Sequence, residues 1–339
     1  MQAVVFTGPG QLSITELPEP APGPGEVLLR PVVTGVCGTD LHLLAGGFLA
    51  RYPLVPGHEI VAEVVAMGPE VVSPPLGTLV AVDNTELCDR CAYCQAGQPL
   101  YCANFRSLGV NAPGGFAELM VARAEKCFAI EALDPMVAVM TEPLACAMHG
   151  ADTLALAPGS DVLVFGAGPT GLLLAQLLVH GNAARLTVAA PSPAKLELAR
   201  AFGADHTVLV DRADPAAAAA ELLDRAPLGY DAVVEATGSP AVLAGCLPLT
   251  RTGGTVLVYG VADESDRWSI SPYEIFAREL TVKGSFAQTH CFGRALLALT
   301  TGRVRTEGIV TDVVPLSSFD QALAAVRSSA SVKAVVVPG

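Results

Sequence analysis

The sequence predicts an α/β protein of two domains, one mostly β and the other built on a doubly wound, parallel, six-stranded sheet. Its 339 residues exceed the length of most single domains, which is about 100–200 residues. The first part of the chain contains short apolar stretches interrupted by Pro and Gly, as in PEPAPGPG at 18–25. After about residue 150, strand-like apolar runs alternate with helical patterns. We therefore expect the mostly β domain to come first.

The alternating part begins with an apolar run at 161–165 (DVLVF), which is typical of a buried parallel strand. The glycine-rich turn GAGPTG follows at 166–171, and a helical pattern continues over 172–179. Between a strand and a helix, such glycines allow a tight turn and let a pyrophosphate approach the helix N-terminus. The alternative is an ordinary strand–helix turn. The predicted cofactor-binding residues of this turn are Gly166, Gly168, Pro169, Thr170 and Gly171.

Further strands and helices are predicted beyond this turn. The strands lie at 185–189, 207–210, 232–235, 255–260 and 280–285. The helices lie at 194–202, 215–225, 240–247 and 272–278. With the first strand, this pattern predicts a doubly wound sheet that binds a dinucleotide at its switch point. The tail from 294 to 339 is expected to form a helix and short strands, including 333–337, and to return to the first domain.

The composition excludes several classes of protein. Apolar residues make up 51% of the chain and charged residues 16%, so the chain is not disordered and can bury a large core. The formal net charge of −13 argues against nucleic acid and anionic membranes as partners, because both need a basic face. No apolar run approaches the roughly 18 residues of a membrane span, and Met1–Phe6 lacks the features of a signal peptide. We expect a cytoplasmic protein that acts on a small molecule.

Four cysteines lie within fifteen residues, in the pattern Cys-x2-Cys-x2-Cys-x7-Cys. In an intracellular chain, such a cluster is more typical of a metal site than of disulfides. Four thiolates complete the tetrahedral coordination of zinc and leave no position for water or substrate, so we expect a structural zinc that holds a lobe at 84–105. Two disulfides or four free thiols are the alternative. The predicted ligands are Cys88, Cys91, Cys94 and Cys102.

A second, open metal site is predicted from segments that lie further apart. The motif VCGTDLH supplies Cys37, PGHE supplies His58 and Glu59, and TEPLA supplies Glu142. Thiolate, imidazole and carboxylate together are a mixture that zinc accepts. Three protein ligands and one free position suit a catalytic zinc, which polarises an alcohol or carbonyl oxygen.

Two residues just beyond Cys37 could carry a proton away from that metal. The hydroxyl of Thr39 can donate and accept a hydrogen bond at once, and the imidazole of His42 can accept a proton and release it. The alternative is that Thr39 caps a helix and His42 is a solvated side chain on it. The two interpretations are compatible.

Together these motifs resemble the zinc-dependent medium-chain dehydrogenase/reductase family across essentially the full chain. The shared segments are VCGTDLH, PGHE, the four-cysteine pattern, TEPLA, GAGPTG and KGSF at 283–286. The resemblance implies a GroES-like catalytic domain at 1–148, a Rossmann domain at 149–286 and a return to the catalytic domain at 287–339. It implies hydride transfer between a secondary alcohol or polyol, or its ketone, and the nicotinamide of NAD(P), with two zinc ions per chain, one catalytic and one structural.

Within that family, the GHE and TEPLA segments look like the branch of sorbitol, threonine and other polyol dehydrogenases. In that branch, the residues matching Cys37, His58 and Glu59 bind zinc. The residue matching Glu142 either binds zinc or hydrogen-bonds its water, and both possibilities stay open here.

Two positions depart from sorbitol dehydrogenases. Those enzymes commonly carry Tyr directly after the His matching His42, and Arg directly after the KGxF segment. This chain has Leu43 and Ala287 there. We expect a less polar substrate pocket, which argues against sorbitol itself.

The second strand of the nucleotide domain predicts a preference for NADP over NAD. An acidic residue about 20 positions beyond the glycines would bind the ribose 2′-hydroxyl of NAD. That place falls at Ala190, where no acid stands to repel a 2′-phosphate. Ser192 can donate a hydrogen bond, Lys195 can add charge from the next helix, and Arg212 ends the neighbouring strand, within reach of the phosphate. Dual specificity is the alternative.

The family resemblance also implies a homodimer or homotetramer. We expect the apolar strand around 255–261 to form a sheet edge suited to self-pairing, unless it is internal or covered.

Two other functions are alternatives to the dehydrogenase. A non-catalytic nucleotide-binding protein would lack zinc ligands or relay residues, and a metal-free enone reductase would lack both cysteine-containing sites.

Overall fold

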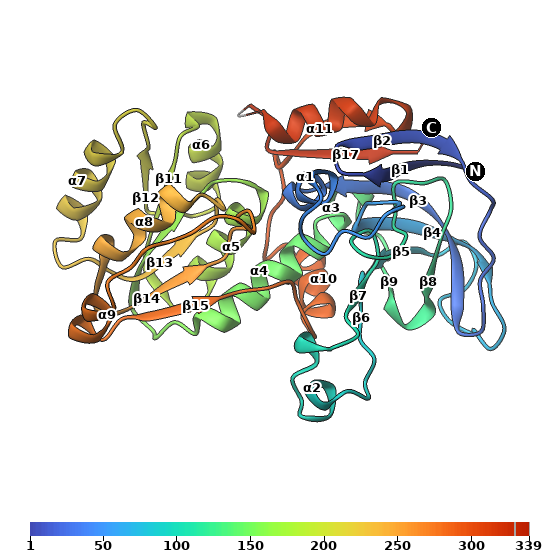
Figure 1. The fold of residues 1–339 in the computed structure, drawn as a ribbon, viewed down its shortest axis with the longest axis horizontal. Coiled ribbons are helices and arrows are strands. Elements are labelled where there is room, and N and C mark those ends of the chain that lie inside the picture. The colour runs from blue at the N-terminus through green and yellow to red at the C-terminus, as the bar shows by residue number, and fades with distance from the viewer. Residues whose placement is uncertain (329, 339) are drawn as a thin grey trace. The chain divides into compact units, whose positions relative to one another are not determined.

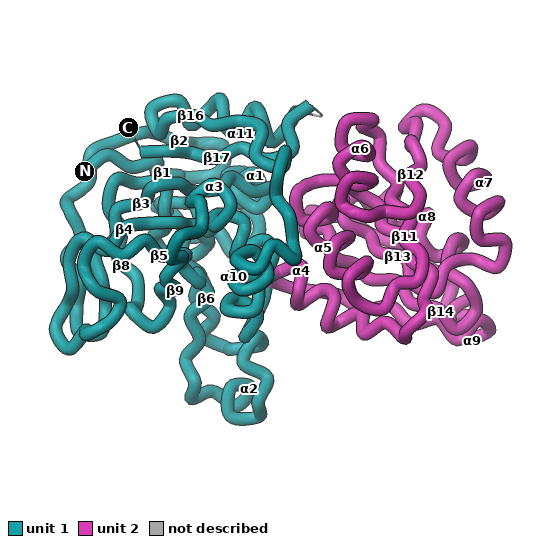
Figure 2. Tube along the Cα trace, turned by 180° about the vertical axis from the view of Figure 1, so that it is seen from behind, with its two compact units in different colours: residues 1–145, 288–339 teal, residues 146–287 magenta. Residues whose placement is uncertain are grey.

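The computed structural model describes residues 1–328 and 330–338 (Figure 1). The chain forms two compact units, one of residues 1–145 and 288–339 and one of residues 146–287 (Figure 2). The domain limits given above, after residues 148 and 286, stay a prediction, because compactness alone does not define a domain that folds independently. None of the helices described is both long and apolar enough to cross a membrane.

The second unit contains the predicted six-stranded sheet, and all of its strands are parallel. Their spatial order is β12-β11-β10-β13-β14-β15, so the doubly wound fold class is confirmed. The strand order reverses between β10 and β13, which lie side by side although two strands separate them in sequence. The strands are β10 (Ser160–Phe165), β11 (Ala183–Ala190), β12 (His206–Leu209), β13 (Tyr230–Glu235), β14 (Thr250–Val258) and β15 (Thr281–Gly284).

The helices of this unit all begin with proline, whose fixed φ and missing N–H suit the first helical position. Helix α5 contacts α6, whereas α7 contacts α8. Apolar side chains of α7 and α8 pack with those of the central strands in one buried cluster. The reversal of strand order accounts for this grouping, since right-handed crossovers in opposite directions place helices on opposite faces. The helices are α5 (Pro169–His180), α6 (Pro193–Ala201), α7 (Pro215–Arg225), α8 (Pro240–Leu249) and α9 (Pro272–Arg278).

The prediction that the strand around 255–261 forms an edge of the sheet is wrong. Strand β14, which covers most of the 255–261 segment, is internal because β15 pairs with it on the side away from β13. Helix α9 returns the chain so that Thr255 pairs with Thr281 and Val258 with Gly284. The outer strand on this side is therefore β15, which is short and largely exposed.

The first unit is mostly β, as predicted. Its largest sheet has the order β16-β17-β3-β4-β5-β9, with β8 also paired to β3. The strands of this unit are β1 (Gln2–Gly8), β2 (Gln11–Glu16), β3 (Glu26–Val36), β4 (Glu59–Met67), β5 (Leu79–Val82), β6 (Thr85–Glu86), β7 (Arg106–Ser107), β8 (Met120–Arg123), β9 (Cys127–Ala129), β16 (Val310–Pro315) and β17 (Lys333–Val337). Its helices are α1 (Gly38–Ala45), α2 (Ala92–Gln95), α3 (Pro135–Ala138), α10 (Phe292–Thr300) and α11 (Phe319–Arg327), with 3-10 turns at Pro99–Tyr101, Ala124–Lys126 and Leu316–Ser318. Helix α4 (Thr141–Leu154) begins in this unit and continues into the other.

The C-terminal tail returns to the first unit. Strand β17 pairs antiparallel with β3, so that Val335 lies opposite Gly35. Helix α11 packs on β16 and β17, and the ring of Phe319 lies 6.3 Å from Phe6 and 4.7 Å from Phe116 between centroids. Figure 1 shows α11 and β17 beside the N-terminal strands. Residues near 333 are thereby placed next to β3, which ends at the predicted open metal site.

Candidate metal centres and cofactor site

The structure gathers three of the predicted ligands of the open metal site. Cys37 directly follows β3 and is the N-cap of α1, and His58 and Glu59 stand where β4 begins. Strands β3 and β4 are antiparallel, with Gly35 opposite Glu59, so the end of one lies beside the start of the other. The donor atoms of Cys37, His58 and Glu59 all lie within 4.8 Å of one another. This geometry can hold one metal ion.

His58 is oriented by a buried carboxylate. Asp40 is fully buried; its Oδ2 accepts a hydrogen bond from the Cys37 N–H at 2.9 Å, and its Oδ1 lies 3.7 Å from Nδ1 of His58. Burial alone would lower the pKa of His58, but Asp40, Cys37 and Glu142 raise it to about 10. Burial likewise raises the pKa of Asp40, against the influence of His58. Because Nδ1 faces Asp40, Nε2 is the nitrogen left for a metal.

Glu59 is paired with a lysine from the far end of the chain. Lys333, at the start of β17, is 2% exposed, and its ammonium contacts the Glu59 carboxylate. The carboxylate passes over Gly35 of the intervening strand, where a Cβ would lie 1.8 Å from Glu59 Oε2. Burial works to lower the pKa of Lys333, but Glu59 and then Cys37 and Glu142 raise it above its usual value. A side chain on Gly35 would therefore disturb this ion pair.

Glu142 lies in the first turn of α4 and is 9% exposed. It does not belong to the group of donor atoms within 4.8 Å. Its charge nevertheless raises the pKa of both His58 and Lys333, so it acts on the same cluster.

The two predicted relay residues lie on α1. Thr39 is not the helix cap, because Cys37 occupies that position; the alternative role as a cap is therefore wrong. The Thr39 hydroxyl lies 3.6 Å from Sγ of Cys37. His42 follows three residues later, on the same helical face, and is half-buried rather than fully solvated.

The four-cysteine lobe lies between β6 and β7 and contains α2. Its sulfur–sulfur distances are 3.4 Å for Cys88–Cys102, 3.5 Å for Cys91–Cys94 and 4.0 Å for Cys91–Cys102. Four sulfurs about 2.3 Å from one zinc would lie roughly 3.8 Å apart, so the cluster fits that ion. Hydrogen bonds, first from Asn104, lower the pKa of the Cys88 thiol to about 6. All nine cysteines of the chain are free thiols, which does not favour the disulfide alternative.

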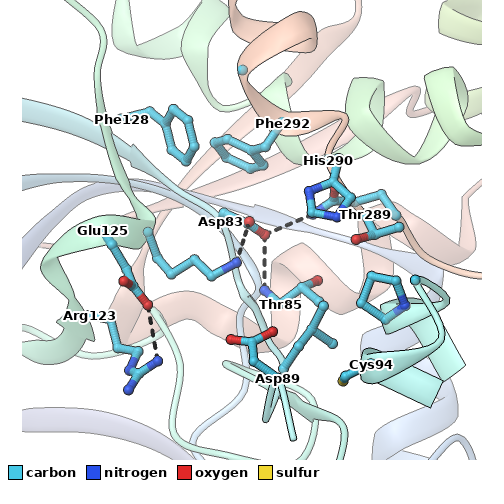
Figure 3. A pocket seen from close by; sticks show the side chains of 16 residues that line it. Asp83, Thr85, Asp89, Cys94, Arg123, Glu125, Phe128, Thr289, His290 and Phe292 are labelled. Atoms are coloured by element: carbon cyan, nitrogen blue, oxygen red, sulfur yellow. Dashed lines mark hydrogen bonds and ion pairs between the residues drawn. The ribbon is translucent and has the colours of Figure 1, made fainter. Parts of the chain in front are cut away.

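A cavity of about 690 Å³ lies beside this lobe in the first unit. Its most connected side chain is Asp83, which accepts hydrogen bonds from the Thr85 N–H at 3.1 Å, Lys126 Nζ at 2.9 Å and Gln288 Nε2 at 2.7 Å (Figure 3). Cys94 belongs to the lining, but none of the three gathered ligands of the open site does. The cavity is thus separate from that predicted metal site.

The glycine-rich turn joins β10 to α5 as predicted. Gly166 has φ +111°, and a Cβ there would lie 2.8 Å from the carbonyl oxygen of Ala236. A Cβ on Gly171 would lie 2.2 Å from the carbonyl oxygen of Gly166. Beside Gly168, by contrast, no heavy atom lies within 4 Å of a Cβ position. Two glycines therefore permit the turn, while the third leaves its backbone open to a phosphate at the helix N-terminus.

The predicted 2′-phosphate residues lie near the ends of two neighbouring strands. Ala190 ends β11, and its carbonyl accepts from the Val210 N–H at 3.0 Å, just beyond β12. Ser192 is the N-cap of α6, and partial burial lowers the pKa of Lys195 in its first turn. Arg212 does not end β12 as expected, because that strand stops at Leu209; it lies in the exposed turn beyond.

Comparison with known proteins gives the family. Residues 23–132 match the alcohol dehydrogenase GroES-like domain, and residues 169–301 match the zinc-binding dehydrogenases. D-arabinitol dehydrogenase 1 of Uromyces fabae is 42% identical over 339 residues, which cover 100% of this chain and 97% of that protein. D-altritol 5-dehydrogenase of Agrobacterium fabrum is 34% identical and covers 94% of both chains. The chain belongs to the zinc-dependent medium-chain dehydrogenase/reductase family.

Solved structures with the same fold agree with that assignment. A dehydrogenase from Sinorhizobium meliloti 1021, described as zinc-binding and bound to NADP, is 32% identical with a TM-score of 0.91 over 99% of each chain. An alcohol dehydrogenase from E. coli CFT073 in complex with NADH is 28% identical with a TM-score of 0.89 over 99% of each chain. The protein is an oxidoreductase of the alcohol dehydrogenase type, so the non-catalytic alternative is not supported.

Sequence reasoning missed two residues of this dehydrogenase site, Asp40 and Lys333. Asp40 could have been found, because it stands three residues after Cys37, where an acid can close a helix N-terminus. The only signal for Lys333 was a charge opening an otherwise apolar strand, KAVVV, since buried lysines need a partner. Leu43, one of the two departures from sorbitol dehydrogenases, is 0% exposed and packs in the apolar core of the first unit.

Proposed function

We propose that the protein transfers a hydride between the secondary alcohol of an acyclic polyol and NADP, with a catalytic and a structural zinc. The observation that carries this proposal is the convergence of a thiol, an imidazole and a carboxylate, from Cys37, His58 and Glu59, within 4.8 Å. Such a donor set, with His58 and Glu59 buried and the Thr39 hydroxyl 3.6 Å from Cys37 Sγ, suits metal-assisted alcohol oxidation. It also argues against a metal-free enone reductase. The names of the relatives from Uromyces fabae and Agrobacterium fabrum support a polyol as substrate.

In this proposal Cys37, His58 and a carboxylate, from Glu59 or Glu142, hold the catalytic zinc. When bound, zinc supplies Lewis acidity that makes an alcohol proton easier to remove. Asp40 keeps His58 in one orientation, and Lys333 balances the charge of Glu59.

The alcohol proton leaves through α1 in this scheme. The Thr39 hydroxyl, 3.6 Å from Cys37 Sγ, accepts it and passes a proton on towards His42. His42 lies on the same helical face and is only half-buried, so it can exchange that proton with solvent.

The carboxyl ends of the strands in the second unit would hold the cofactor. The open backbone at Gly168 and the N-terminus of α5 would bind its pyrophosphate. Ser192, Lys195 and Arg212, which lie beyond the ends of β11 and β12, would bind the 2′-phosphate of NADP.

The four-cysteine lobe holds the structural zinc, and we expect Cys91→Ser to destabilise the protein rather than alter its chemistry. The lobe has little apolar core of its own, so the metal contributes directly to its folding. Thermal unfolding should begin several degrees lower than in the wild type, and the zinc content should fall by about one ion per chain. The remaining folded protein should keep its KM for substrate. Calorimetry and metal analysis check this; a Cys91→Ser variant with wild-type stability and zinc content would refute the structural zinc.

The substrate class is tested by turnover on a panel of acyclic polyols and simple secondary alcohols with NADP. We expect kcat/KM for D-arabinitol to exceed that for sorbitol by roughly tenfold, the size of effect that one lost polar contact to the longer chain would produce. Ala287 replaces the arginine that sorbitol dehydrogenases carry, so sorbitol loses such a contact. Oxidation of L-threonine alone, with no polyol turned over, would contradict the proposed substrate.

We also propose that the protein is a homodimer or homotetramer that pairs through the exposed edge of β15. Val282 on this strand is 39% exposed, and Tyr273 and Phe276 of α9 are 74% and 79% exposed. An open strand edge beside exposed aromatic side chains suits pairing with a second copy.

Light scattering at micromolar concentration should therefore report at least a dimer. Val282→Lys should weaken this association on the order of a hundredfold, because it places like charges opposite each other at a two-fold contact. Leu297→Lys on α10 replaces another exposed apolar side chain, 62% exposed, and should leave the mass unchanged. A monomeric wild type would rule this proposal out.

A further inference from the structure

The turn that follows β13 is built around one buried carboxylate. Glu235 is the last residue of β13 and is 1% exposed. Its Oε1 accepts hydrogen bonds from the Thr237 N–H at 2.7 Å and from the Thr237 hydroxyl, and its Oε2 accepts from the Gly238 N–H at 3.2 Å. Both oxygens act as acceptors, which is the pattern of an ionised carboxylate.

The same turn joins the ends of three neighbouring strands. On the β10 side, the Ala236 N–H donates to the carbonyl of Phe165 at 2.9 Å. On the β14 side, the Gly260 N–H donates to the carbonyl of Glu235 at 2.7 Å, and a Cβ on Gly260 would lie 2.8 Å from Glu235 Oε2. The strand order reverses between β10 and β13, and open α/β sheets bind their ligands at that point. Glu235 thus lies at the carboxyl end of β13, next to the point where the strand order reverses and where the cofactor is predicted to bind.

The charge of this carboxylate is not cancelled by a cation. Within residues 1–328 and 330–338, the donors recorded for Glu235 are amides and a hydroxyl, and no ion pair includes it. Neutral donors stabilise an anion without removing its net charge. The negative charge of Glu235 acts on a neighbouring group: after burial, it is the second cause that raises the pKa of the Cys246 thiol.

We propose that Glu235 is a positioning residue whose fixed negative charge makes this crevice favour oxidised over reduced nicotinamide cofactor. The nicotinamide ring carries a positive charge when oxidised and none when reduced, so the carboxylate attracts only the oxidised ring. Two unit charges roughly 10 Å apart, at an effective dielectric constant of about 20, attract each other by an amount that corresponds to about tenfold in binding, which sets the size of effect expected here. The hydrogen bonds of Glu235 also fix the backbone of residues 236–238 and so affect both forms equally. The inference rests on the proposed use of NADP.

The experiment measures the Kd of NADP and of NADPH separately, by calorimetry on the full-length protein. In Glu235→Gln, the Kd of NADP should rise about tenfold more than that of NADPH, because the charge is gone while the shape is kept. Thr237→Val removes a hydrogen bond but keeps the charge, so both affinities should fall equally. Glu221→Gln makes the same chemical change on the exposed face of α7 and should alter neither value.

A second pair of variants keeps the test open if Glu235→Gln does not fold. Ser239 is the N-cap of α8, but its side chain makes no capping hydrogen bond. Ser239→Lys adds a positive charge beside the turn and should reduce the preference for NADP over NADPH, whereas the neutral Ser239→Gln should not. Equal weakening of both forms in Glu235→Gln, or an unchanged preference in Ser239→Lys, overturns the inference. A wild-type protein that binds neither form contradicts the proposed function instead.

Discussion

Cys37→Ser should lower kcat/KM by at least about a thousandfold while the protein stays folded. The change removes the thiolate from the proposed three-ligand set of the catalytic zinc. Zinc contributes several kcal/mol of transition-state stabilisation to such reactions, which corresponds to that factor. The lobe with Cys88, Cys91, Cys94 and Cys102 is untouched, so about one zinc per chain should remain. Steady-state kinetics measure kcat/KM, metal analysis measures the zinc content, and thermal unfolding shows that the variant is folded, all on the same preparation.

A matched control separates this result from a general effect of losing a thiol. Cys127→Ser changes a cysteine outside both clusters, whose Sγ donates to the carbonyl of Arg123, a bond that a serine hydroxyl can also make. Its rate and zinc content should equal those of the wild type. Normal turnover in Cys37→Ser would show that the open site is assigned to the wrong residues.

The second large effect is expected on the choice of cofactor. The wild type should use NADP with a higher kcat/KM than NAD, since no acid stands at Ala190 to repel the 2′-phosphate. Ser192→Asp should reverse this preference by about a hundredfold in the ratio, because it places a carboxylate against the phosphate while remaining a favourable helix N-cap. Arg212→Ala should lower kcat/KM for NADP about tenfold and leave that for NAD unchanged, as expected for one charged contact.

The kinetic comparison uses both cofactors at a fixed concentration of polyol. Arg225→Ala is the matched control for Arg212, because Arg225 is an arginine at the end of α7 that pairs with Glu221. Arg225→Ala should change kcat/KM neither for NADP nor for NAD. A clear advantage for NAD in the wild type would mean that the missing acid was misread, and similar values would indicate dual specificity.

Where function depends on residues close together in sequence, the sequence predicted the structure well. The strand, glycines and helix at 161–179 form β10, the turn and α5, because each is specified by local periodicity and by glycine's freedom at positive φ. The four-cysteine lobe gathers its sulfurs for the same reason, since short spacers leave them no room to separate. Six parallel strands followed from the repeated alternation, and right-handed crossovers then fix their order.

Whether β14 is an internal or an outer strand could not be predicted from local sequence patterns. An apolar strand looks the same in sequence whether it is internal or outermost, because both faces of a parallel sheet are covered by helices. Only the pairing of β15 with β14 decided which strand carries the free edge. The exposed side chains of α9 became informative once that edge was known.

By itself, the sequence determined the family of this protein and predicted which residues bind metal, because both depend on residue identity and on short spacings. Tertiary structure alone decided how their charges are balanced. Lys333 meets Glu59 only because β17 pairs with β3, and because Gly35 leaves a gap through which the carboxylate reaches. Asp40 faces His58 only because α1 starts where β4 begins. A buried charge needs a partner of opposite charge, and only the fold determines which residue can supply it. In a chain of this length that residue can be hundreds of positions away, so no local sequence pattern predicts it.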